Sequence, residues 1–302
     1  MNIFNGGHMI KNIILDMGNV LMDYNPDVIL NQSFDDRESQ EQIKKELFHG
    51  PEWVEGDKGL LTDEEIYKAI RGRIPESLHA GLFNCVMNWD ICMVPLPGAK
   101  ELCRQVKEKS YGLYVLSNAS PKFYTYFPKE FPLEQFDGIL TSSEVHLVKP
   151  DIGIYQHFLQ KFSLNAEECL FVDDRKNNVD AAISAGMKGL QFTGDYNKIW
   201  QFIEEDENTF STTTKQLRIT DTVTGENQVF SPSIYQSCMH PEEIKIYEMT
   251  VRKLSETEIE IQTHYGTWNI NLEGKKVEIY PWKGEIHKTD CKKCENCGRC
   301  GW

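Results

Sequence analysis

The sequence predicts an α/β protein with a doubly wound parallel sheet, a helical cap and a small β-rich module toward the C-terminus. Short apolar runs bounded by turn residues recur along the chain, and helical patterns lie between most of them. This alternation of strand and helix is typical of a parallel sheet with helices on both faces. The predicted strands are 12–15, 111–116, 138–140, 169–172 and 189–192.

The helical patterns complete the predicted core, which spans residues 10–203. Apolar residues recur at helical spacing in 98–109, 152–162 and 179–185. An insert at 27–94 separates the first two strands and is too long for a simple crossover. It is rich in helix signals, and the segment from Thr62 to Glu65 has the sequence of a capping box. We therefore predict that the insert is a helical cap over the active site.

The composition changes after the predicted core. Residues 204–214 are polar and lack apolar periodicity, which predicts a linker. The segments that follow alternate apolar and polar residues or are rich in β-branched and aromatic ones, so we predict a small antiparallel β module at 215–290. Its expected strands are 244–251, 258–263, 267–272 and 276–280.

Charge limits the classes of partner. The 302-residue chain has a net charge of −14, with 20 Lys+Arg against 33 Asp+Glu before Lys215 and 12 against 13 from there on. Nucleic acid or an anionic membrane would be repelled, so a small-molecule substrate is the better expectation. No apolar run approaches the roughly 20 residues that span a bilayer. We expect a cytoplasmic protein.

Polar residues follow four of the predicted strands, where parallel α/β sheets bind their ligands. Asp16 follows the first strand, and its carboxylate can attack phosphorus if a cation screens the approach of two anions. Ser117 and Asn118 follow the second strand and can donate hydrogen bonds to phosphate oxygens.

The other two strand ends carry charged groups. Lys149 follows the third strand and offers a cation to the transition state. Asp173 and Asp174 follow the fourth and supply the hard oxygen ligands that suit Mg²⁺. Four polar segments at successive strand ends favour phosphoryl chemistry more strongly than any one of them alone.

In this order, the four segments resemble the four sequence motifs of the haloacid-dehalogenase-like hydrolases, over roughly residues 12–202. The resemblance implies a Mg²⁺-dependent phosphatase with a Rossmann-like core and Asp16 as the nucleophile. The metal would be held by the Asp16 carboxylate, the Gly18 carbonyl and Asp174, with Asp173 beside it. The phosphoryl group would be held by Ser117, Asn118 and Lys149.

The chain departs from the family pattern at Gly18. Phosphatases of this family usually have a second Asp there, which protonates the leaving oxygen and later activates water. The Asp-x-Gly-Asn-Val form from Asp16 to Val20 resembles a bacterial branch that includes sugar-phosphate phosphatases. Asp23 is one candidate substitute for the second Asp, and a solvated turn residue is the alternative interpretation of it.

Two other functions are weighed against a phosphomonoester hydrolase acting on a small phosphorylated metabolite, for which a sugar phosphate is one candidate. L-2-haloacid dehalogenases share the scaffold and lack the second Asp, but two carboxylates near Asp16 would repel its charge in a reaction without metal. A non-catalytic sensor that binds a phosphorylated ligand is the alternative from another class, and Gly18 is the feature that favours it.

The end of the chain carries a separate signal. Cys291, Cys294, Cys297 and Cys300 have two-residue gaps that let thiolates turn toward one ion. Zn²⁺ and an iron–sulfur cluster are both candidates, as is a tail without a specific metal. We therefore treat 291–302 as a possible metal-binding tail, with no predicted protein partner. In the cap, Trp53 and Trp89 are candidates for lining a substrate pocket or for packing in the core.

Overall fold

The computed structural model describes residues 9–212, 215–236, 244–281 and 286–288. By its internal contacts the chain divides into two compact units, one formed by Ile10–Trp200 and one that contains the chain from Gln201 on. The four C-terminal cysteines with the predicted metal site lie outside the described residues. No helix in the described ranges is both long and apolar enough to cross a membrane.

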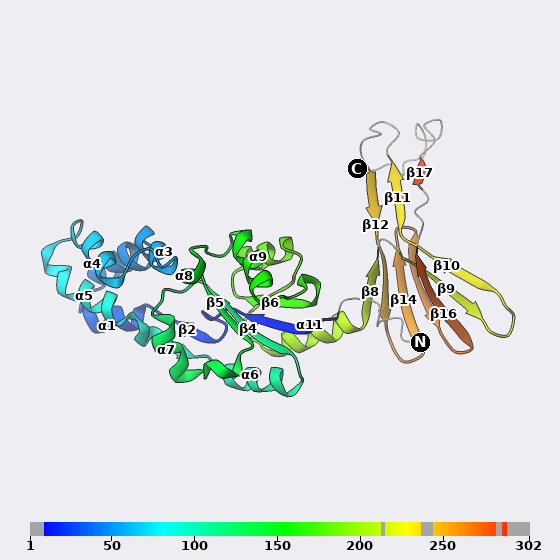
Figure 1. The fold of residues 1–302 in the computed structure, drawn as a ribbon, viewed down its shortest axis with the longest axis horizontal. Coiled ribbons are helices and arrows are strands. Elements are labelled where there is room, and N and C mark those ends of the chain that lie inside the picture. Colours follow the sequence, from blue (N-terminus) through cyan, green and yellow to red (C-terminus); the bar gives the residue numbers. More distant parts are fainter. Residues whose placement is uncertain (1–8, 213–214, 237–243, 282–285, 289–302) are drawn as a thin grey trace. The chain divides into compact units, whose positions relative to one another are not determined.

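The first unit is built on a five-stranded parallel sheet with the order β5-β4-β1-β6-β7 (Figure 1). The chain passes from β1 to β4 and β5 on one side, and then returns to β6 and β7 on the other side of β1. The strand order therefore reverses at β1, and open α/β sheets bind ligands at such a reversal. The strands are β1 (Asn12–Leu15), β4 (Gly112–Ser117), β5 (Gly138–Thr141), β6 (Cys169–Asp173) and β7 (Lys188–Gln191).

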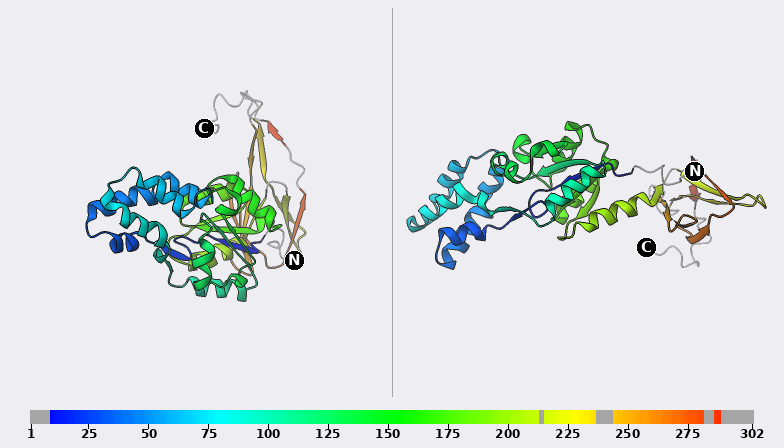
Figure 2. Two further views of the ribbon diagram at one scale, coloured as in Figure 1. Left: turned by 60° about the vertical axis from the view of Figure 1, so that its left-hand side comes forward. Right: turned by 90° about the horizontal axis from the view of Figure 1, so that it is seen from below.

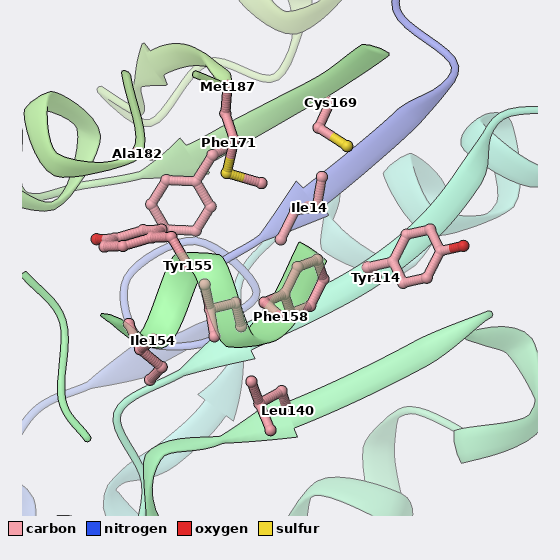
Figure 3. Packing of buried hydrophobic residues seen from close by; sticks show 11 residues of the cluster. Ile14, Tyr114, Leu140, Ile154, Tyr155, Phe158, Cys169, Phe171, Ala182 and Met187 are labelled. Carbon is pink, nitrogen blue, oxygen red and sulfur yellow. The ribbon is translucent and has the colours of Figure 1, made fainter. Parts of the chain in front are cut away.

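Alternate residues of each strand face the two helical layers. On one face, Ile14 and Phe171 pack with Tyr155 and Phe158 of α9 (Ile152–Lys161) in a fully buried cluster (Figure 3). The rings of Tyr155 and Phe171 meet edge to face with centroids 5.4 Å apart. Replacing such a buried aromatic residue with Ala typically costs about 3–5 kcal/mol, so this cluster fixes the sheet that positions the strand ends.

On the opposite face lie α6 (Ala99–Glu108) and the start of α11 (Asn197–Glu207), of which the residues up to Trp200 belong to this unit (Figures 1 and 2). Trp200 joins these helices, because its indole Nε1 donates to Gln105 Oε1 at 3.1 Å. The sheet is therefore covered on both faces, and the predicted doubly wound architecture is confirmed. The core also contains α7 (Phe123–Glu130), α8 (Ser142–Val145) and α10 (Lys176–Ser184).

The insert between β1 and β4 is helical, as predicted. A short antiparallel pair, β2 (Met22–Tyr24) with β3 (Met93–Pro95), connects it to the core. Thr62 and Glu65 form the predicted capping box, in which Thr62 N donates to Glu65 Oε2 at 2.8 Å and Glu65 N to Thr62 Oγ1 at 3.3 Å. The cap helices are α1 (Asp27–Ser33), α2 (Arg37–Ile43), a π-helix (Lys44–Phe48), α3 (Pro51–Asp57), α4 (Asp63–Arg71) and α5 (His79–Asn88).

The prediction of a linker at 204–214 is wrong for the residues that the structure describes. Helix α11 continues to Glu207, and β8 (Thr209–Thr212) pairs antiparallel with β13 (Met249–Lys253). Glutamate is a good helix former and its charge stays solvated, so an acidic run extends a helix without adding apolar periodicity. Threonine suits strands in the same way, because it is β-branched.

The second unit is rich in β-strands, as predicted, in three sheets with the orders β15-β14-β13-β8, β10-β9-β16 and β12-β11-β17. Its buried core includes Leu217, Val251 and Ile259. The segment expected as one strand at 244–251 is two strands, β12 and β13. The remaining strands are β9 (Lys215–Asp221), β10 (Asn227–Phe230), β11 (Ser233–Gln236), β12 (Ile244–Tyr247), β14 (Glu258–Thr263), β15 (Gly266–Asn271), β16 (Lys275–Pro281) and β17 (Ile286–Lys288).

Candidate active site

A buried lysine joins three of the strand ends. Lys149 Nζ lies 2.7 Å from Asp16 Oδ1 and 2.7 Å from Asp173 Oδ2, and it donates to the Leu116 carbonyl at 3.0 Å. All of its donors are therefore directed to the carboxyl ends of β1, β4 and β6. Lys149 and Asp173 are almost completely buried, at 4% and 0% exposure, and Asp16 is 8% exposed. The predicted nucleophile and the predicted cation thus lie in contact.

The two adjacent aspartates have different surroundings. Both oxygens of Asp173 accept hydrogen bonds inside the protein, from Lys149 Nζ, from Asn178 Nδ2 and from the Arg175 backbone N–H. Asp174 is partly exposed, and its Oδ2 accepts from Asn19 Nδ2 at 3.0 Å. Asp173 therefore positions Lys149, whereas Asp174 has oxygen lone pairs that remain accessible.

The three aspartates form a group suited to a divalent cation. Each of the three residues offers one carboxylate oxygen, and these three oxygens lie within 4.8 Å of one another; the residues are Asp16, Asp173 and Asp174. Three carboxylates and one ammonium group leave two negative charges in a largely buried site, and a divalent ion would neutralise them. Hard carboxylate oxygens are the ligands that Mg²⁺ prefers, so the predicted metal fits these residues.

The electrostatics of Asp16 reflect this excess of negative charge. Burial is the largest cause that raises the pKa of Asp16, to about 7, and Lys149 opposes it. The charges of Asp173 and Asp174 raise the pKa further. A single lysine therefore does not compensate for the burial of this carboxylate, and a bound cation would favour its ionised, nucleophilic form.

Ser117 and Asn118 lie at the end of β4, beside this group. Asn118 Nδ2 donates to the Lys149 carbonyl at 3.0 Å, and the Lys149 N–H donates to Asn118 Oδ1 at 2.8 Å. The side-chain amide of Asn118 therefore holds the Lys149 segment in place. Ser117 is 1% exposed. Contact of either side chain with a phosphoryl group stays a prediction.

Gly18 lies in an open part of the site. A Cβ atom built on Gly18 would meet no atom within 4 Å. Packing therefore does not require glycine here. Asp23, the predicted substitute for the second Asp, is in β2 opposite Val94 and is partly exposed; its role stays a prediction.

Sequence analysis missed Asn19 and Asn178, which orient Asp174 and Asp173. Asn178 is 2% exposed and lies in the first turn of α10, five residues after Asp173, where the helix returns its side chain to the end of β6. An amide at the start of the helix that follows an acidic strand end is the signal that could have indicated it.

Aromatic residues connect the cap to the nucleophile strand. Trp53 and Trp89 meet edge to face with centroids 5.2 Å apart, and Trp89 contacts Tyr126 at 5.5 Å. The Tyr126 hydroxyl donates to Met17 Sδ at 3.4 Å, next to Asp16. Trp89 is 6% exposed, so it acts mainly in packing. We call the following residues the aromatic cluster: Tyr24, Phe48, Trp53, Trp89 and Tyr126.

A buried aspartate and lysine lie at the reversal of a parallel sheet with a helical insert, an arrangement suited to a hydrolase, and comparison with known proteins identifies the family. Residues 10–186 match the model of the haloacid dehalogenase-like hydrolases. The sesquiterpene phosphatase astK of Aspergillus oryzae is 30% identical over 186 residues, which are 61% of this chain and 90% of that protein. The chain therefore belongs to the haloacid dehalogenase-like hydrolases, as predicted.

Solved structures share the fold. A family enzyme from Bacteroides thetaiotaomicron in complex with magnesium and inorganic phosphate has a TM-score of 0.51 at 21% identity, and the match covers 63% of this chain and 99% of that one. The L-2-haloacid dehalogenase RSc1362 has a TM-score of 0.52 at 19% identity, with 65% and 99% covered. The fold alone therefore does not separate phosphatase from dehalogenase, and the site residues must do so.

Proposed function

We propose that the protein is a Mg²⁺-dependent phosphomonoester hydrolase that acts through an aspartyl-phosphate on Asp16. The observation that carries the proposal is the group of three carboxylates at the ends of β1 and β6, two of which contact Lys149. The 30% identity to a protein named a phosphatase supports it.

Each residue has a role in this reaction. The Asp16 carboxylate attacks phosphorus, and the Lys149 ammonium lies beside it to stabilise negative charge on the transferring group. Asp173 and Asn118 hold Lys149 in position. Mg²⁺, held by Asp16, Asp174 and the Gly18 carbonyl, would screen the approach of the two anions.

The same charges oppose dehalogenation. That reaction displaces halide from carbon without a metal, and Asp174 and Asp173 would then remain as anions next to the nucleophile. Both raise the pKa of Asp16 and so disfavour its ionised form. A phosphate ester with Mg²⁺ removes this conflict.

The substrate is proposed to be a small phosphorylated metabolite, and a sugar phosphate remains one candidate. A monophosphate of an apolar alcohol is a second candidate. The name of the Aspergillus relative, a sesquiterpene phosphatase, supports the same class.

Phosphate release tests the proposal directly. The full chain with Mg²⁺ is assayed against sugar, nucleotide and isoprenoid monophosphates and against 2-chloropropionate, with Asp16→Asn as the control. Phosphate release that Asp16→Asn abolishes is expected. Chloride release from 2-chloropropionate, without phosphate release from any ester, would contradict the proposal.

Metal binding by the C-terminal cysteines is a separate proposal about the tail. Lys292, Lys293 and Arg299 alternate with the thiols and would favour thiolates. Elemental analysis of anaerobically purified protein should find Zn or Fe that is lost in Cys294→Ser/Cys297→Ser. Equal metal content in both proteins would contradict it.

A further inference from the structure

The proposed hydrolase lacks one group that its chemistry needs. An alkoxide is a poor leaving group unless it is protonated as its bond to phosphorus breaks, and the water that later attacks the aspartyl-phosphate must lose a proton. Gly18 has no side chain to do either. A carboxyl group near the predicted phosphoryl-binding residues and without an ion-pair partner would suit both steps.

Asp57 is the last residue of α3 in the cap. The backbone N–H of Ser120, in the loop that follows Ser117 at the end of β4, lies close enough to the Asp57 carboxyl group to lower its pKa. A cap carboxyl group is therefore held against the loop that carries two of the predicted phosphoryl-binding residues.

Backbone contacts fix the end of α3 on the core. Ser142 Oγ donates to the Asp57 carbonyl at 2.5 Å and accepts from the Ala119 N–H at 2.9 Å. The next carbonyl, of Lys58, lies 2.7 Å from His146 Nδ1. The contacts at Ala119 and Ser142 lie on the core elements that follow β4 and β5, so the position of Asp57 is set by the same sheet that positions the strand ends.

Two hydroxyl groups of this region have no hydrogen-bond partner. Within the part of the chain that the structure describes, Tyr24 Oη and Ser120 Oγ are buried without a hydrogen-bond partner. Burial raises the pKa of Tyr24 and of Tyr126; Asp57 adds to both shifts, and Asp90 and Asp16 add to that of Tyr126. Tyr126 thus lies within electrostatic range of both carboxylates. Buried hydroxyls without a partner are typical of a site that binds a polar group.

The other charged groups of this region are paired with one another. Lys122 Nζ lies 3.3 Å from Asp63 Oδ2 and 3.1 Å from Asp90 Oδ1, and 5.5 Å from the Trp89 ring centroid. Among the described residues, no cation forms an ion pair with Asp57. Burial raises the pKa of Asp57 to about 7, opposed only by the Ser120 N–H. A group with this pKa can both donate and accept a proton near neutral pH.

We propose that Asp57 supplies, from the cap, the general acid and base that Gly18 lacks; this inference rests on the proposed function. As Asp16 bonds to phosphorus and the P–O bond of the ester breaks, Asp57 gives its proton to the leaving oxygen. Water then attacks phosphorus and passes a proton to Asp57. The bond from phosphorus to Asp16 breaks, and inorganic phosphate leaves.

Two esters of matched shape test the acid step. Phenolate needs protonation far more than p-nitrophenolate does, so Asp57→Asn should lower kcat/KM on phenyl phosphate by about 100-fold and on p-nitrophenyl phosphate only several-fold. Asn keeps an oxygen acceptor for the Ser120 N–H, and circular dichroism checks the fold. Asp23→Asn tests the other candidate for this role, and the proposal predicts no selective loss on phenyl phosphate. Equal losses on both esters in Asp57→Asn, or a selective loss in Asp23→Asn, would overturn the assignment.

A rescue experiment distinguishes a role of Asp57 in catalysis from a role in positioning the cap. Because a side chain at Gly18 meets no atom, Gly18→Asp can restore the usual second carboxylate. Adding Gly18→Asp to Asp57→Asn should raise kcat/KM on phenyl phosphate at least tenfold. No recovery would mean that Asp57 acts only on cap position. If the wild-type protein hydrolyses neither ester, the proposed function itself is overturned.

Discussion

The end of β1 in the core and the end of α3 in the cap each hold a carboxyl group whose pKa is raised to about 7. Their surroundings differ. Asp16 lies among Lys149, Asp173 and Asp174, whereas Asp57 has one backbone N–H near its carboxyl group and no ion-pair partner among the described residues. A crowded charged group suits a metal and a nucleophile, and an isolated carboxyl group suits proton transfer. Similar pKa values therefore indicate different chemistry.

Removing the nucleophile should have the largest effect. Asp16→Asn keeps the shape of the side chain but lacks the attacking charge, so kcat should fall by about 10⁴-fold or more. Steady-state phosphate release measures the loss, with circular dichroism as the check on folding. Turnover within tenfold of the wild type would show that another residue accepts the phosphoryl group.

The dependence of activity on Mg²⁺ should distinguish the core site at Asp16 from Asp57 in the cap. EDTA should abolish turnover and Mg²⁺ restore it. Asp174→Asn should raise the Mg²⁺ concentration for half-maximal activity at least about tenfold. Asp57→Asn should leave that concentration unchanged, because no metal is expected in the cap. Titrating the wild type and both variants with Mg²⁺ measures these concentrations. An equal increase in both variants would contradict the assignment of the metal to the core site alone.

The buried ion group should dominate stability in the core. Lys149→Met leaves Asp16 and Asp173 without their cation, so the free energy of unfolding should fall by about 3–5 kcal/mol. Adding Asp16→Asn should recover part of this loss, because one unpaired charge is removed. Urea denaturation measures both. A loss in the double variant equal to the sum of the two single losses would show that the pair is not coupled.

In the cap, the expected effect on stability has the opposite sign. The folded-state pKa of Asp57 is raised above its ordinary value, so its contribution to stability is fully present below about pH 4 and is lost as pH rises through about 7. Asp57→Asn should therefore match the wild type at pH 4 and be more stable at pH 8, by about 1–3 kcal/mol. Urea denaturation at both pH values tests this; lower stability at pH 8 would contradict burial as the cause.

The smallest effect is expected from removing the second unit. A stop after Asn208 keeps α11 and removes β8, and it leaves both carboxyl groups in place. This boundary lies before β8, because β8 pairs with β13 of the second unit. The kcat/KM of the truncated protein should stay within about twofold of the full chain. Aggregation or loss of turnover would mean that the units depend on each other.

The sequence showed the core site better than the cap site for a physical reason. Asp16, Lys149 and Asp173 follow short apolar strands, and parallel strands bring their carboxyl ends together. Asp57 lies in a segment of ordinary cap composition. It is partly buried, by the loop at Ser120 and by Ser142 at the start of α8, which are distant in the chain, so no local pattern marks it.

The same reason explains the elements that were missed. The acidic end of α11 and the threonine-rich β8 have propensity but no apolar periodicity, and their partners lie elsewhere in the chain. The short β2–β3 pair likewise depends on residues separated by the whole cap. Periodicity predicts an element only where one face of it is buried along its length.

The most direct test of the account is to find where the phosphoryl group resides in a protein that forms the aspartyl-phosphate but resolves it slowly. Asp57→Asn is mixed with p-nitrophenyl phosphate and Mg²⁺, quenched in acid and analysed by peptide mass spectrometry. We predict one acid-stable phosphoryl group on the peptide that contains Asp16, and none in Asp16→Asn/Asp57→Asn. Full turnover without any phosphorylated peptide, or a phosphoryl group on another residue, would contradict the account.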